Sequence, residues 1–119
     1  MLTSRLRRTA LSAAAIVLTA LVAGLTAPVA LADADIKLVI ENHKFEPAEI
    51  RVPANQKIRI VIDNRDATPE EFESTGLRAE KVIPGKSKGV VIVGPLKPGR
   101  YSFVGEFNEA TAQGVLIAE

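Results

Sequence analysis

The sequence predicts an all-β domain, a Greek-key β-sandwich or barrel, preceded by an N-terminal signal peptide. Two observations predict the sheets. Apolar and polar residues alternate with a period of two after position 35, and turn-forming residues separate the alternating runs at intervals of about ten residues. Six or seven short strands at this spacing are typical of a sandwich or barrel.

The predicted strands follow one another along the chain, each ended by a turn. In the third run, three isoleucines alternate with Lys57, Arg59 and Asp63, so this strand has one buried face. The run 90–93 is apolar throughout, which is typical of a strand buried on both faces or lying in the centre of a sandwich. The predicted strands are 36–40, 49–52, 57–63, 90–93, 101–104 and 115–117, with turns at 53–55, 64–66, 84–85, 98–99 and 114.

The pattern Leu96-Lys97-Pro98-Gly99-Arg100-Tyr101 predicts a corner between the two sheets. In such a corner, the hydroxyl of a tyrosine bonds back to the backbone a few residues upstream. We therefore predict structural roles for Pro98, Gly99 and Tyr101.

The first 32 residues have the three parts of a secretory signal peptide. Three arginines within 5–8 form a positive region, an apolar stretch follows over 10–29, and Ala30-Leu31-Ala32 matches the small-x-small pattern of a cleavage site. A spanning helix needs about 20 apolar residues, so a retained membrane anchor is the alternative. We expect export to the periplasm and cleavage after Ala32.

The chain then divides into a signal peptide at 1–32 and one domain at 33–119. Without the three arginines of the first segment, 12 basic and 14 acidic residues remain, which gives a net charge of 12 − 14 = −2. A length of this order suits one small domain. Because no basic stripe is visible, we expect no nucleic-acid partner.

The residue types that are missing exclude several classes of function. The sequence has no Cys, and its only Met is the initiator. Disulfides, disulfide-linked partners, thiolate catalysis and sulfur-ligated metal sites are therefore excluded. There is also a single His, no G-x-S-x-G motif, no phosphate-binding glycine loop and no H-E-x-x-H motif. We do not expect an enzyme.

Several motifs of the domain match one known family. They are Phe45-x-Pro47-x-x-Ile50-x-Val52-Pro53-Ala54, Asn64, Pro69-Glu70-Glu71-Phe72-Glu73, Tyr101-x-Phe103 and Gly114. With these motifs the domain resembles cupredoxin-like proteins. More narrowly, the segments 68–74, 80–85 and 105–109 are similar to exported cupredoxin-like proteins associated with bacterial iron permeases, relatives of EfeO-type iron-uptake proteins. This resemblance implies a membrane iron permease, or other periplasmic uptake components, as partners.

Copper cupredoxins bind a type 1 copper ion through two His, one Cys and usually one Met. By the resemblance, the two His positions fall at Glu70 and Asn108. The Cys position falls at Gly105, and the Met position lies near Ala112 or Gln113, so all four ligands are absent. Because the blue-copper centre requires the thiolate, we expect no type 1 copper.

Oxygen donors gather in the segments where the family binds metal. If the predicted loop 68–74 is extended, Glu71 and Glu73 share a face and Glu70 points the other way. Related iron-uptake domains are thought to use a Glu of this loop as a ligand, which by the resemblance is Glu71. The candidate metal ligands are Glu71, Glu73, Glu80, Glu106, Asn108 and the lone imidazole His43. This donor set suits Fe³⁺, Fe²⁺, Mn²⁺ or Cu²⁺, and we expect a copper or iron ion.

Two functions stay open at this point. The first is a periplasmic cupredoxin-like accessory protein of iron or copper uptake that binds a metal ion through carboxylates. The second is a metal-free periplasmic interaction module that docks on a membrane transporter. The second stays open because, with 14 acidic residues in a domain this short, some of them must cluster even if they bind no metal.

Overall fold

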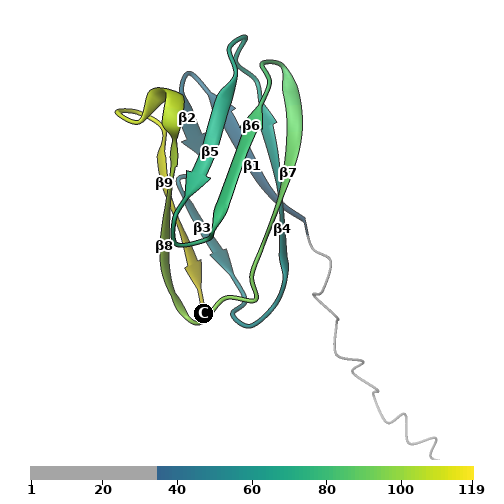
Figure 1. Cartoon of the computed structure of the whole chain (residues 1–119), viewed down its shortest axis with the longest axis vertical. Helices are drawn as coiled ribbons and strands as arrows, with labels where there is room; N and C mark the ends of the chain where they lie inside the picture. The colour runs from purple at the N-terminus through teal and green to yellow at the C-terminus, as the bar shows by residue number, and fades with distance from the viewer. Residues whose placement is uncertain (1–34) are drawn as a thin grey trace, which may run out of the picture.

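Residues 35–119, the part of the chain that the computed structural model describes, form nine strands in two facing sheets (Figure 1). The strands are β1 (Asp35–Glu41), β2 (Lys44–Glu46), β3 (Glu49–Val52), β4 (Ile58–Asn64), β5 (Glu70–Ser74), β6 (Ala79–Ile83), β7 (Ser87–Val93), β8 (Gly99–Gly105) and β9 (Gln113–Ala118). A short 3₁₀ helix, η2 (Glu106–Asn108), connects β8 to β9. The predicted all-β sandwich is confirmed.

The predicted signal peptide at 1–32, with its cleavage site after Ala32, lies outside the described residues. So does the start of the predicted domain at position 33. Within 35–119, no helix has both the length and the apolar character of a membrane span.

The order of the strands brings distant segments together. One sheet has the order β2-β1-β4-β7 and the other β3-β9-β8-β5-β6. β1 runs parallel to β4 and β3 parallel to β9, and the other pairs are antiparallel. β5 pairs with β8, so that Phe72 lies opposite Gly105. The start of β5 therefore lies beside the segment that leaves β8.

The inner faces of the two sheets form one apolar core. The isoleucines of β4 point inward as predicted, and Ile60 and Ile62 have no exposed surface. Phe103 packs against two further rings, with centroid distances of 5.0 Å to Phe45 and 5.1 Å to Phe72. Full burial of each such side chain contributes about 1.5–3 kcal/mol.

Two predictions about the strands are wrong. Residues 70–74 form the strand β5 and not a loop, and they pair with β6 on one side and β8 on the other. The run 90–93 is neither buried on both faces nor central, because β7 is an edge strand and every second side chain of the run faces solvent. Val91 is buried, whereas its neighbours Val90 and Ile92 are 37% and 59% exposed. The apolar run therefore follows the ordinary period-two alternation of a half-buried strand.

The predicted corner is held by a hydrogen bond from the Tyr101 hydroxyl to the Lys97 carbonyl at 2.7 Å. Pro98 and Gly99 connect these two residues at the start of β8. We expect Tyr101→Phe to lower the free energy of unfolding by about 1 kcal/mol, because it removes this bond and keeps the ring. Urea denaturation of the two proteins measures the change. An unchanged midpoint would show that the bond contributes nothing to stability.

Candidate metal centre

Four glutamates gather on the outer face of the second sheet. Phe72 lies in the core without exposed surface, so its neighbours Glu71 and Glu73 point away from the core. Glu80 on β6 lies directly opposite Glu73 in the antiparallel register, which places it on the same face. Glu106 is the first residue of η2, which lies beside the upper part of β5 (Figure 1).

Three of these side chains converge closely enough to share a cation. Glu71, Glu80 and Glu106 each place one carboxylate oxygen within 4.8 Å of the other two. Glu71 is only 8% exposed, an unusual burial for a carboxylate, whereas Glu80 and Glu106 are exposed. The group combines one shielded carboxylate with two that solvent reaches.

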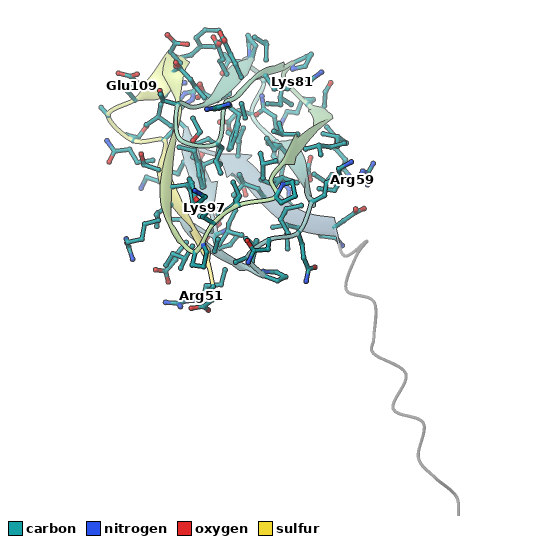
Figure 2. The ribbon with its side chains drawn as sticks, turned by 60° about the horizontal axis from the view of Figure 1, so that its bottom comes forward. Arg51, Arg59, Lys81, Lys97 and Glu109 are labelled. Atoms are coloured by element: carbon teal, nitrogen blue, oxygen red, sulfur yellow. The ribbon has the colours of Figure 1, made fainter. Side chains whose placement is uncertain are left out.

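The four glutamates form no ion pair with a base in the described part of the chain. Within 35–119, no Lys, Arg or His forms an ion pair with any of them. The ion pairs lie elsewhere, for example at Arg51 and Arg59, whose side chains point outward (Figure 2). Arg51 lies at the end of the domain opposite Glu109, which follows η2 (Figure 2). Within the described residues, no ion pair therefore offsets the negative charge of the group.

This crowding raises the proton affinity of the buried member. The pKa of Glu71 is raised to about 7, first because the side chain of Glu80 hydrogen-bonds to it, and further because solvent is excluded and Glu106 repels its charge. The pKa of Glu73 is also raised, because Glu106 hydrogen-bonds to it and repels its charge. Two carboxyl groups hydrogen-bond to each other only through a proton. A metal cation would replace that proton.

The positions that correspond to the copper ligands of the family lie together, but Glu70 and Asn108 occupy the two His positions and hydrogen-bond to each other. Glu70 points to the face opposite Glu71 and Glu73, as predicted; this is the inner face, and Glu70 is 1% exposed. Its Oε2 accepts a hydrogen bond from Asn108 Nδ2 at 2.7 Å, and its Oε1 accepts one from the Phe107 N–H at 2.9 Å. A Cβ at Gly105, the position of the Cys, would lie 2.7 Å from Glu70 Cδ and 2.6 Å from Ala112 Cβ. These residues supply no thiolate and leave no room for one, so they do not fit type 1 copper.

Two predicted ligands are not brought to the glutamate group. Asn108 uses its side-chain nitrogen to bind Glu70. His43 lies in the β1–β2 turn, with Nδ1 3.6 Å from Asp66 Oδ2. Asn42 and His43 have φ angles of 53° and 56°, the left-handed pair that a type I′ hairpin requires. The turn therefore fixes His43 next to Asp66, so the carboxylate group has no nitrogen donor from either residue.

Sequence reasoning missed two features beside the group. Glu70 was considered only as the place of an absent His, although a buried acid must have hydrogen-bond donors, and this rule could have indicated its partners. Arg78 was not singled out, yet it lines a shallow cavity of about 340 Å³ together with Glu73 and Glu80. Recognising 70–83 as a hairpin would have placed Arg78 next to these acids.

Comparison with known proteins agrees with this architecture. The profile of the cupredoxin-like domain family matches residues 12–118. The chain belongs to this family. An uncharacterised protein of Rickettsia prowazekii (strain Madrid E) is 45% identical to this cupredoxin-like chain over 83 residues. The match covers 70% of the chain and 66% of the relative, just under two thirds of that protein's length.

Solved structures with the same fold include two copper proteins. A copper-binding protein solved by NMR in the apo form has a TM-score of 0.63 and 23% identity, covering 71% of this cupredoxin-like chain and 86% of that chain. The metal-binding domain of the Cu(I)-exporting P-type ATPase CopA of Streptococcus pneumoniae D39, solved with Cu(I), has a TM-score of 0.61 and 16% identity. That match covers 71% of this chain and 84% of the ATPase domain. At such identities the likeness establishes the fold.

Proposed function

We propose that this cupredoxin-like protein is a periplasmic accessory of iron or copper uptake that binds a metal ion through carboxylates. The observation that carries the proposal is the convergence of Glu71, Glu80 and Glu106, with one ligand atom each within 4.8 Å of the others. Because no basic side chain of residues 35–119 pairs with them, a cation at their centre would relieve their mutual repulsion. Glu73 adjoins Glu106 and adds to the negative potential.

The donor set favours hard or borderline ions. With His43 and Asn108 outside the group, the ligands are oxygen atoms alone, and carboxylates suit hard ions. The resemblance to iron-permease-associated proteins supports iron, and the two similar copper proteins support copper. The proposed partners are a membrane iron permease or other periplasmic uptake components. The proposal assigns no enzymatic step to the chain.

A metal titration of residues 33–119 tests the proposal. We expect calorimetry to show about micromolar or tighter binding of Cu²⁺, or of Fe³⁺ supplied as a weak chelate to prevent hydrolysis. Glu71→Gln should abolish this binding, because it removes the charge of the shielded ligand. No intense blue band should accompany copper binding, because the chain has no thiolate.

His43, a predicted ligand that lies outside the glutamate group, provides a matched control. His43→Asn keeps a residue that tolerates the left-handed turn and removes the imidazole, so metal affinity should not change. Binding no stronger than that of an unrelated acidic protein would refute the proposal. So would a loss of affinity in His43→Asn together with unchanged affinity in Glu71→Gln.

The second candidate function is a metal-free module that docks on a membrane transporter. Phe107 and Val82, which adjoin the glutamate group, are 51% and 49% exposed. Large apolar side chains at the surface often belong to protein contacts when they gather in a patch. This candidate predicts no specific heat of metal binding in the same titration.

A further inference from the structure

We propose that Glu70 is the positioning residue of the metal site, because it holds η2 against β5 and thereby keeps Glu106 beside Glu71. This inference rests on the proposed metal-binding function. Glu70 faces the interior, on the side of β5 opposite to Glu71 and Glu73. It therefore acts through the backbone and not as a ligand.

Glu70 bonds to both of the segments that it joins. Its Oε1 accepts hydrogen bonds from the backbone N–H of Glu71 at 3.1 Å and of Phe107 at 2.9 Å. Its Oε2 accepts a hydrogen bond from Asn108 Nδ2 at 2.7 Å. Hydrogen bonds to a charged acceptor are stronger than bonds between neutral groups, and 1% exposure shields these from water. Phe107 follows Glu106 directly, so the bond to its N–H fixes the peptide that carries the ligand.

η2 depends on this residue for its attachment. The first N–H groups of a helix have no partner inside it, and Gly105, which precedes η2, has no side chain to supply one. Beyond η2 the loop closes on itself, because the Gly105 N–H donates to the Ala112 carbonyl and the Ala112 N–H donates to the Asn108 carbonyl, both at 2.8 Å. Among the described residues, the hydrogen bonds from N–H groups of η2 to β5 both end on Glu70.

Electrostatics makes such an anchor necessary. Glu106 lies next to Glu71 and Glu80, with one carboxylate oxygen of each within 4.8 Å of the others. Without a basic partner, like charges separate unless the chain holds them. Loss of the anchor would let η2 move away, which leaves Glu71 and Glu80 without the third carboxylate.

Two replacements separate the geometry of Glu70 from its charge. Glu70→Ala removes all three acceptor bonds. Glu70→Gln keeps an oxygen for the two backbone N–H groups, and its Nε2 can donate to the Asn108 oxygen once that amide turns over. The glutamine variant therefore preserves the attachment of η2 without the negative charge.

The test compares metal affinity and the attachment of η2 in these variants. We expect Glu70→Ala to bind Cu²⁺ or Fe³⁺ about 10–100-fold more weakly than wild type, as typical for loss of an outer-shell partner, and Glu70→Gln to restore most of the affinity. Without metal, the Phe107 amide should exchange with solvent faster in Glu70→Ala and at the wild-type rate in Glu70→Gln. Ser74→Ala is the matched control, because Ser74 also lies buried on β5 and its hydrogen bonds go to Ser102 and Leu77 and not to η2.

Three results would overturn the inference while leaving the proposed function intact. The first is wild-type metal affinity in Glu70→Ala. The second is a loss of metal affinity in Glu70→Gln as large as in Glu70→Ala, and the third is a loss of the same size in Ser74→Ala. Absence of metal binding by the wild-type chain would instead refute the proposed function, and the role of Glu70 in a metal site with it.

Discussion

Asn64→Ala is expected to destabilise the domain by roughly 3–5 kcal/mol, because it strips hydrogen bonds from several buried groups and leaves a cavity. Asn64 ends β4 and has no exposed surface. Its Nδ2 donates to the carbonyls of Thr68 at 2.9 Å, Ile83 at 3.1 Å and Pro84 at 3.2 Å. Its Oδ1 accepts the N–H of Asp66 at 3.1 Å. One side chain thus joins the loop before β5 to the turn after β6.

Asn64→Asp distinguishes hydrogen bonding from volume. The carboxylate has nearly the same shape, but it has no hydrogen to donate and would face carbonyl oxygens. We expect a loss of stability at least as large as in Asn64→Ala. Urea denaturation at about pH 7, where the introduced carboxyl group is ionised in the unfolded chain, measures both variants. Near-wild-type stability of the aspartate variant would show that packing and not hydrogen bonding determines the role of Asn64.

Much of the fold was predictable because its strands follow a simple rule. β1, β3, β4 and β8 alternate apolar and polar residues, and their inward apolar side chains lie in the core or pack against it, whereas β9 ends in a continuous apolar run. β5 escaped prediction as a strand because three of its five residues are acidic. Its inward side chain at position 70 is an acid whose burial depends on donors from η2, and no local pattern reveals such donors.

The candidate site was predictable in part. Alternation alone places Glu71 and Glu73 on one face and Glu70 on the other, and the structure agrees. The pairing of Glu73 with Glu80 depends on the hairpin register, which the sequence does not state. His43 could not be located from the sequence, because its position depends on a left-handed turn bonded to Asp66, 23 residues away.

The apo domain is expected to become more stable as the pH is lowered from about 7 to about 5, the opposite of a domain whose carboxylates are paired with bases. Glu71 has an ordinary pKa of 4.5, and in the fold its pKa is raised to about 7. Between these values the folded chain binds more protons than the unfolded chain, so stability falls as the pH rises. The raised pKa of Glu73 acts in the same direction. The charged groups that raise the pKa of Glu71 are Glu80 from β6 and Glu106 from η2, and both are acids.

Asp66 limits this gain at lower pH. Its pKa is lowered from 3.8, first because the His43 N–H donates to it, with the Asn42 N–H and the charges of His43 and Lys86 adding to the effect. A lowered pKa contributes stability that is present above the ordinary value and is lost as the pH falls through the folded value. The two effects therefore act in separate pH ranges, and the melting temperature should be highest at about pH 5.

Thermal unfolding between about pH 4 and pH 8 in the presence of a chelator checks this profile, with Glu71→Gln as the control. In this variant the melting temperature should depend much less on pH between about pH 5 and pH 7. The variant should also be more stable than wild type at neutral pH, because one of the crowded charges is gone. A wild-type melting temperature that rises steadily from about pH 5 to pH 7 would contradict the crowded arrangement of the glutamates. The same substitution is expected to abolish metal binding. A substitution that stabilises the apo protein and abolishes cation binding is what we expect at a binding site, because charges that repel one another in the apo protein are kept together there for a ligand.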